Sequence, residues 1–171
     1  MIYQRLEAFI EATGRAIAWL TLALVLVMFS VVVFRFVFDV GWVWLQESAN
    51  YLHAFIFMLG AAYTLKQDGH VRVDILYRKL GTRGQALIDL LGTLLLLIPV
   101  CAFIFYISWD EVIKAWINLE PSQRTGGLDL AYVLKSSMLL MPALMIIQGI
   151  AIVIQKSLLL RGAALTNDGA D

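Results

Sequence analysis

Charged residues are scarce in this chain of 171 residues. Asp, Glu, Lys and Arg make up 15% of it, whereas hydrophobic residues make up 61%. A soluble domain of average composition is about 25% charged, so the composition argues against a soluble fold. Acidic and basic residues are equal in number, at 13 each, and no run is rich in Lys and Arg. Nothing therefore suggests a partner made of nucleic acid.

Cysteine and histidine are also nearly absent. Cys101 is the single cysteine, so the chain can form neither a disulfide framework nor a cysteine metal cluster. The sequence contains no nucleophile and base pair, no spacing typical of metal ligands and no glycine loop that could bind phosphate. The sequence therefore offers no group of residues that could form an active site, and we expect neither catalytic activity nor a cofactor.

Four long stretches contain no charged residue at all. Each has about 18 to 20 residues, which at about 1.5 Å rise per residue matches a hydrocarbon core of roughly 30 Å. They cover 16–34, 48–65, 90–109 and 136–155. The first is too long for a signal-peptide core and is expected to stay in the protein. The sequence predicts an all-α membrane protein: one domain over 1–171, with transmembrane helices at about 16–38, 43–65, 86–118 and 131–156.

Basic residues are distributed unequally over the two sides that these four helices define. Nine of the 13 lie in the N-terminal tail, the second connection and the C-terminal tail, and four lie on the opposite side. The positive-inside rule then places both termini in the cytoplasm. Four of the five tryptophans fall at the opposite, outer boundary, where indole rings prefer to sit; they are Trp42, Trp44, Trp109 and Trp116.

The connections differ in length and character. The first, Asp39 to Trp42, is short and forces an antiparallel hairpin. The second carries apolar residues at helical spacing between basic residues after His70, which predicts a short helix in the cytoplasmic interface. Beyond the third run a 3.6-residue period continues from Trp109 to Ile117 among charged residues. Helix three is therefore expected to extend outward as an amphipathic segment.

Helix two carries a polar face. Gln46, Asn50 and His53 are spaced four and three residues apart, so they share one side of a helix beside Glu47. Ionisable and amide groups at membrane depth normally point at a partner helix and not at lipid. This face is a candidate interface with a partner, made of Trp44, Gln46, Glu47, Asn50, His53 and Gly60.

Arg35 and Glu47 flank the first connection and form a candidate charge pair across the outer hairpin, with Asp39 as a second possible partner of the arginine. Alternatively, each side chain extends separately to lipid headgroups. A proton relay through Glu47 would need further acids at membrane depth, and there are none.

His53 has two functional interpretations, haem ligation and proton transfer, and one structural interpretation, polar packing against another helix. Haem held by two histidines needs a second imidazole at similar depth, whereas His70 lies in the second connection. Packing is favoured. In helix four, a weakly polar face is interpreted as helix-to-helix contact; it consists of Ser137, Met141, Leu144 and Gln148.

Three segments, 44–52, 57–62 and 69–74, read WLQESANYL, FMLGAA and GHVRVD. In this order and spacing they resemble the signature of the small membrane subunit of TRAP (tripartite ATP-independent periplasmic) transporters, the DctQ type. The family's Trp-Glu element corresponds to Trp44 and Glu47. Its Gly-His-Val-Asp element corresponds to Gly69, His70, Val73 and Asp74. The candidate cytoplasmic motif consists of Gly69, His70, Arg72 and Asp74. Family members often carry proline before helix four, where this chain has LDLA at 128–131.

The resemblance implies a scaffold subunit in the bacterial inner membrane. In such a system a large membrane subunit carries the substrate and sodium sites, a periplasmic binding protein delivers an organic acid, and the small subunit braces the large one among the phospholipids. Two other functions remain open: a haem-bearing membrane anchor of a respiratory complex, which would use His53, and a small ion-coupled exporter acting alone, which would use Glu47.

Overall fold

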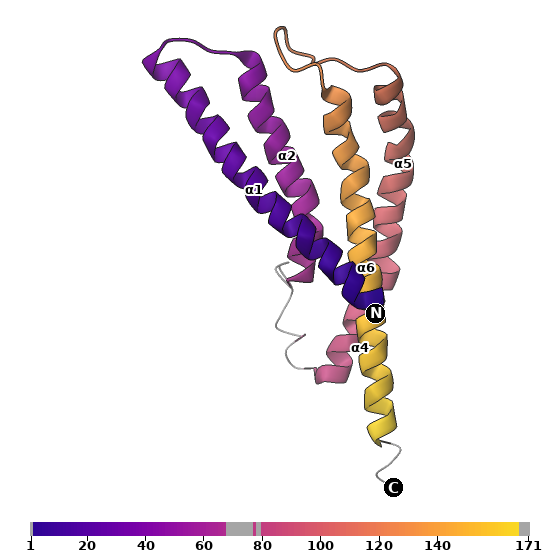
Figure 1. Ribbon diagram of the computed structural model, residues 1–171. Helices are drawn as coiled ribbons and strands as arrows, with labels where there is room; N and C mark the ends of the chain where they lie inside the picture. The colour runs from indigo at the N-terminus through magenta and orange to yellow at the C-terminus, as the bar shows by residue number, and fades with distance from the viewer. Residues whose placement is uncertain (1, 68–76, 78–79, 168–171) are drawn as a thin grey trace.

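Long helices account for most of the computed structural model, which describes residues 2–67, 77 and 80–167. They form two antiparallel hairpins (Figure 1). The first hairpin joins α1 (Ile2–Val37) to α2 (Val43–Lys66). The second joins a continuous helical run, α4 (Thr82–Gly92), η1 (Thr93–Leu97) and α5 (Ile98–Ile117), to α6 (Ala131–Asn167). The described residues contain no strand.

The two hairpins are joined by packing of α2 against α6, and α1 crosses α6 near its own beginning. They diverge toward the end that carries the connections 38–42 and 118–130, which we call the loop end (Figure 1). The opposite end, where α2 ends and α4 begins, is called the base. The helices of the two hairpins therefore lie farther apart at the loop end than nearer the base.

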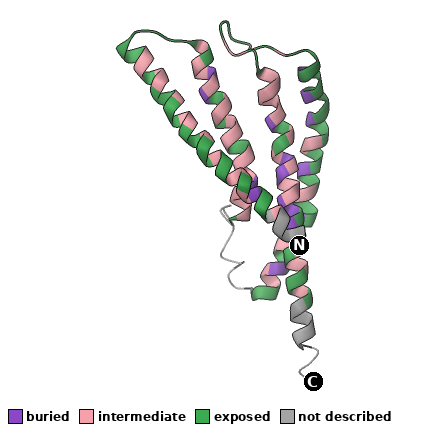
Figure 2. Cartoon of the chain, viewed as in Figure 1, coloured by how far each residue is buried: buried purple, intermediate pink, exposed green. Residues whose placement is uncertain are grey.

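The hydrophobic core lies where α1, α2 and α6 meet. Ile10 and Ala62 are fully buried and pack with Leu144. Figure 2 shows buried residues gathered at this crossing and along α6. At Gly14, a Cβ atom would overlap the ring of Tyr63, so the absence of a side chain lets α1 and α2 approach closely. Small residues at helix contacts are typical of membrane proteins, where packing and not hydrophobicity drives association.

Three helices are long and apolar enough to cross a membrane: Ala8–Val37, Thr82–Ile117 and Ala131–Arg161. The prediction of an all-helical membrane protein is confirmed to this extent. With 24 residues, α2 spans about 36 Å and has the length of a fourth span, but it is not among these three. Its polar face lowers its mean hydropathy. The fourth span and the orientation of the termini therefore stay predictions.

Several helices are longer than the uncharged runs suggested. α1 begins at Ile2 instead of about residue 16, the helical run through α4 begins at Thr82 instead of 86, and α6 continues past 156 to Asn167. The reason is that Glu, Lys and Arg are good helix formers, so charge ends a membrane span without ending the helix. At the other end α5 reaches Ile117, with Val112 buried and Lys114 exposed on its amphipathic last turns.

A π-helical turn, η1, interrupts the second hairpin just before Pro99. Proline has no N–H to donate to the carbonyl four residues earlier, so the regular α pattern cannot pass through this position. The wider turn accommodates the break, as π-bulges commonly do. Pro142 lies inside α6 and is fully buried.

Candidate functional site

Glu47, the fifth residue of α2, is buried at the loop end. Its side chain is only 7% exposed. The carboxylate accepts a hydrogen bond from Ser122 Oγ at 2.6 Å and a second from the backbone N–H of Leu128 at 2.6 Å. Both donors belong to the connection 118–130, so one side chain holds this connection, the outer loop, against α2.

Glycine at position 127 is required by this arrangement. A Cβ atom there would overlap Ser122 Oγ and Glu47 Oε2. The backbone of the outer loop therefore passes directly over the carboxylate. We call Glu47, Ser122, Gly127 and Leu128 the loop latch.

The predicted charge pair between Arg35 and Glu47 is not formed in this structure. Both residues are described, and no ion pair joins them within the described part of the chain. Glu47 is turned toward the outer loop, whereas Arg35 is exposed and lines a shallow hollow at the first connection together with Asp39 and Gln46. Arg35 and Glu47 are close in sequence across the first connection, whereas the hydrogen-bond donors to Glu47 lie 75 and 81 positions away from it.

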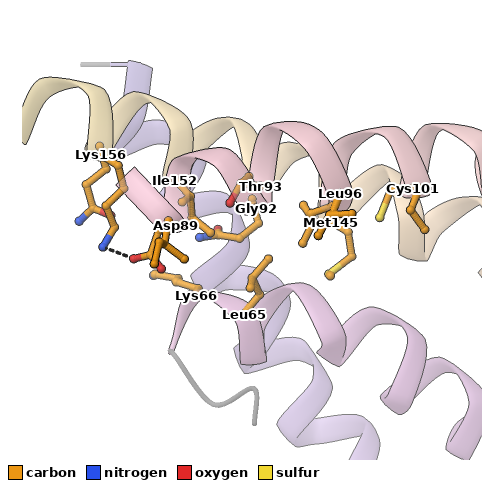
Figure 3. A pocket seen from close by; sticks show the side chains of 15 residues that line it. Leu65, Lys66, Asp89, Gly92, Thr93, Leu96, Cys101, Met145, Ile152 and Lys156 are labelled. Atoms are coloured by element: carbon orange, nitrogen blue, oxygen red, sulfur yellow. Dashed lines mark ion pairs between the residues drawn. The ribbon is translucent and has the colours of Figure 1, made fainter. Parts of the chain in front are cut away.

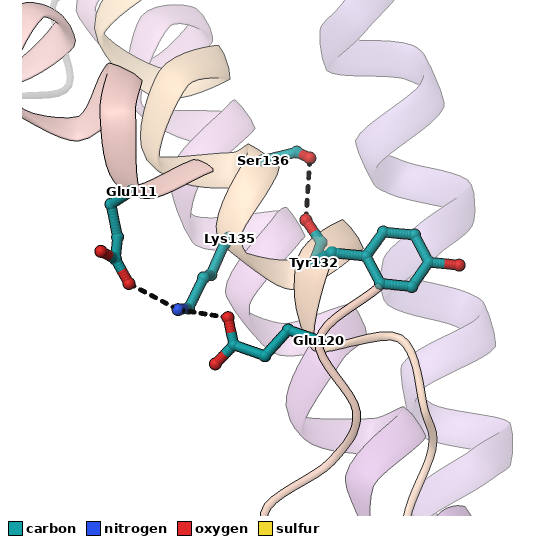
Figure 4. A network of polar contacts seen from close by, with 5 residues as sticks. All are labelled: Glu111, Glu120, Tyr132, Lys135 and Ser136. Carbon is teal, nitrogen blue, oxygen red and sulfur yellow. Dashed lines mark hydrogen bonds and ion pairs between the residues drawn. The ribbon is translucent and has the colours of Figure 1, made fainter. Parts of the chain in front are cut away.

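A second polar network stabilises the same end (Figure 4). Lys135 in the first turns of α6 forms ion pairs with Glu111 of α5 at 2.7 Å and with Glu120 of the outer loop at 2.6 Å. Nearby, the indole N–H of Trp116 donates to Ser136 Oγ at 2.9 Å. Exposed ion pairs are individually weak, but a cation held by two carboxylates fixes the start of α6 relative to α5.

The polar face of α2 is exposed. Asn50 and His53 are exposed and Gln46 is half-buried, and none of their side chains forms a hydrogen bond with any other described residue. The ring of His53 lies against that of Phe57, with 4.6 Å between centroids. Gly60 has open space beside it, with no atom within 4 Å of a built Cβ. Trp44 is half exposed and stacks on Trp42 at 6.1 Å.

These residues therefore fall into two groups. Glu47 accepts hydrogen bonds from other residues of the same chain, as part of the loop latch. Asn50, His53 and Gly60 point away from the chain's own helices, and Trp44 belongs to an aromatic cluster at the loop end.

The cytoplasmic motif, Gly69, His70, Arg72 and Asp74, and the short interfacial helix expected there lie outside the described residues. At the base, however, the structure shows ion pairs between helices: Lys66 with Glu11 at 2.7 Å and Lys156 with Asp89 at 2.7 Å. Tyr77 also donates its hydroxyl hydrogen to Asp89 at 2.8 Å. These pairs were not predicted from the sequence, because their members are distant in the chain and no periodicity relates them.

An all-helical chain with three helices apolar enough to cross a membrane is an integral membrane protein. Residues 3–158 match the family described as "Tripartite ATP-independent periplasmic transporters, DctQ component". The chain belongs to this family, and the resemblance found in the sequence is confirmed.

One relative adds to this assignment. A protein of Haemophilus influenzae, named as a TRAP transporter small permease protein, is 31% identical over 103 residues. The match covers 60% of this chain and 62% of that relative. No solved structure matches the chain.

Proposed function

We propose that this chain braces the large membrane subunit of its TRAP system through the exposed polar face of α2. The observation that carries the proposal is the exposure of Asn50 and His53, which have no hydrogen-bonding partner among the described side chains. A polar group moved into hydrocarbon without a hydrogen bond costs about 1–3 kcal/mol on the scale of protein mutants. A partner helix with donors and acceptors would remove that cost.

The proposal includes a fourth transmembrane span. α2 has the length to cross a bilayer, and a partner along its polar face would make its lower hydropathy tolerable. Both termini then lie in the cytoplasm of a bacterial inner membrane, and the loop end, with its exposed tryptophans, lies at the periplasmic boundary.

The chemistry of transport belongs to other chains in this proposal. The large subunit carries the substrate and sodium sites, and a periplasmic binding protein delivers an organic acid. Within the described residues no three His, Cys, Asp or Glu side chains are grouped as metal ligands, and the charged side chains gather at the loop end and the base. In this proposal the subunit acts by its position, as a scaffold fixed among phospholipids.

Replacing polar side chains on this face tests the proposal. The double variant Asn50→Leu with His53→Leu should lower co-purification of the large subunit, while insertion into the membrane is kept. Thr21→Leu with Ser30→Leu is the matched control, because these hydroxyls bond only to the backbone of α1. Equal co-purification of the two double variants would refute the interface.

The alternative functions have their own readouts in the same preparations. A Soret band in the purified protein would indicate a haem anchor at His53. Transport by this chain alone in vesicles would indicate an exporter. Either result would replace the scaffold proposal.

A further inference from the structure

A cavity of about 720 Å³ opens between the end of α2, the α4–η1–α5 run and α6 (Figure 3). Figure 3 shows Lys66, Asp89 and Lys156 together at one end, which we call the charged end, and Leu96, Met145 and Cys101 toward the other, the inner end. The charged end lies toward the base, because Lys66 is the last residue of α2 and Asp89 belongs to α4. The cavity therefore leads from the base in between apolar helices.

The charged end has no net charge. Lys66 is paired with Glu11 at 2.7 Å and Lys156 with Asp89 at 2.7 Å, so each cation has its own carboxylate. The side chains of Lys66 and Asp89 are only 16% and 11% exposed. Enclosed ion pairs carry a desolvation penalty that can exceed their attraction, and water beside them lowers this penalty. The charged end therefore does not select an ion, but water stabilises it.

Two polar side chains farther from the base are buried in the cavity wall. Gln148 of α6 is 4% exposed and Thr93 of η1 is 8% exposed, and both line the cavity. Neither side chain forms a hydrogen bond with another described residue, and the amide oxygen Oε1 of Gln148 is fully buried. By contrast, the hydroxyls of Thr21 and Thr64 each donate to a carbonyl of their own helix. Unsatisfied buried polar groups are destabilising, so Gln148 and Thr93 each require a further partner.

The partner of Gln148 must be able both to donate and to accept hydrogen bonds. A rotation of its amide by 180° exchanges the oxygen and the nitrogen. In one orientation Nε2 is the amide atom that is not fully buried and needs an acceptor, and in the other Oε1 takes this place and needs a donor. The hydroxyl of Thr93 can likewise donate or accept. An acyl chain does neither and an ester carbonyl only accepts, whereas water does both.

The size of the cavity and the position of these two residues also suit water. One water molecule needs about 10–15 Å³ of accessible space and two to four polar partners, and the cavity is far larger. Positions 148 and 156 are about 12 Å apart along α6, and positions 89 and 93 are about 6 Å apart along the α4–η1 run. A short chain of water molecules therefore reaches from the charged end to Gln148 and Thr93.

We propose that water enters this cavity from the base and that Gln148 and Thr93 bind its innermost ordered molecules. Positions 135 and 148 of α6 are about 20 Å apart along the helix, whereas a hydrocarbon core is roughly 30 Å thick. The apolar barrier between this water and Lys135 at the loop end is therefore thinner than the lengths of the helices indicate. The inference does not depend on the side of the membrane that the base faces.

X-ray radiolytic footprinting of the full chain in phosphatidylcholine nanodiscs tests the proposal. Hydroxyl radicals form from water next to a side chain and oxidise methionine to its sulfoxide. Met145 lines the cavity and is half-buried, whereas Met28 of α1 is 49% exposed but lies in an uncharged run and away from the cavity. We expect Met145 to be oxidised several times faster than Met28. Oxidation of Met28 as fast as that of Met145 would overturn the proposal, because the cavity would then be no wetter than a surface that faces lipid.

Thr93→Val and Thr93→Ser separate the bound water from the packing of η1. Valine replaces the hydroxyl by a methyl group of similar size, and serine keeps the hydroxyl. Thr93→Val should slow the oxidation of Met145 about fivefold, the factor that corresponds to one ordinary hydrogen bond, and Thr93→Ser should leave it unchanged. Equal rates in the two variants would refute the binding of water at Thr93.

Native mass spectrometry of the same preparations identifies the competing occupant. A lipid that remains bound after delipidation, together with slow oxidation of Met145, would show that the cavity holds lipid in place of water. The comparison of Met145 with Met28 needs no variant, so it decides the proposal even where a substitution prevents folding.

Discussion

Glu47 and Leu128 are joined by a hydrogen bond of 2.6 Å between the carboxylate and the backbone N–H, although 81 positions separate them in the sequence. The bond connects the first hairpin to the second at the loop end, where the helices diverge (Figure 1). Together with the hydrogen bond from Ser122, it holds the outer loop against α2 and satisfies the buried carboxylate of Glu47.

The loop latch predicts different effects for the two charges of the first hairpin. Glu47→Gln should lower the thermal unfolding temperature of the purified chain. Ser122 and Leu128 donate to different carboxylate oxygens, and glutamine has an NH2 group, which cannot accept, in place of one of them. Arg35→Gln should leave that temperature nearly unchanged, because Arg35 is exposed and has no ion pair with Glu47. Equal destabilisation by both changes, measured by tryptophan fluorescence on heating, would restore the charge-pair hypothesis.

Gly127→Ala should break the latch without changing any charge. The added methyl group displaces Ser122 and Glu47, and forcing an atom into a filled space typically costs about 1–3 kcal/mol. Gly41→Ala is the control, because nothing lies within 4 Å of its Cβ position in the first connection. Protease accessibility of the outer loop should rise in Gly127→Ala alone; unchanged protection would mean that the latch does not hold the loop.

Variants of Gly14 in α1 and Gly60 in α2 should separate effects on folding from effects on assembly. Gly14→Ala should lower the free energy of unfolding by about 1–3 kcal/mol, since the methyl group meets the ring of Tyr63 at the helix crossing. Gly60→Leu should leave the chain itself stable, because the space beside Gly60 is open, but it should weaken co-purification of the large subunit. A Gly60→Leu variant that assembles normally would show that this position faces lipid.

The orientation is tested by reporter fusions. A reporter that is active only in the cytoplasm should be active when fused after Leu160, and one that is active only in the periplasm should be active when inserted after Gln123 in the outer loop. This expectation rests on the positive-inside rule, because nine basic residues lie on the predicted cytoplasmic side and four on the other. Periplasmic activity after Leu160 would exclude four spans with cytoplasmic termini.

A scaffold should be needed for transport without setting its coupling. In the reconstituted system, His53→Ala, His70→Ala and Asp89→Asn should each change assembly or rate and leave the number of ions moved per substrate unchanged. Parallel measurements of ion and substrate flux give this ratio. An altered ratio in any variant would place the subunit in the transport pathway.

The sequence by itself determined the class of protein. Four uncharged runs and a low charge content predict membrane helices, because hydrocarbon excludes charge over a length that is set by the bilayer. The polar face of α2 could be predicted because Gln46, Asn50 and His53 follow the helical period, and the family could be recognised from short ordered segments. All of these signals are local or compositional.

Only the tertiary structure decided which polar groups form hydrogen bonds or ion pairs with other groups of the same chain. Glu47 is bound by Ser122 and Leu128, Lys135 by Glu111 and Glu120, and Asp89 by Lys156. The packing of η1 beside α6 buries the side-chain oxygen of Gln148 without a hydrogen-bond donor, and the sequence does not show this. The period of a helix fixes which residues share a face, but the partner of that face depends on how separate helices pack, and no local pattern contains this information.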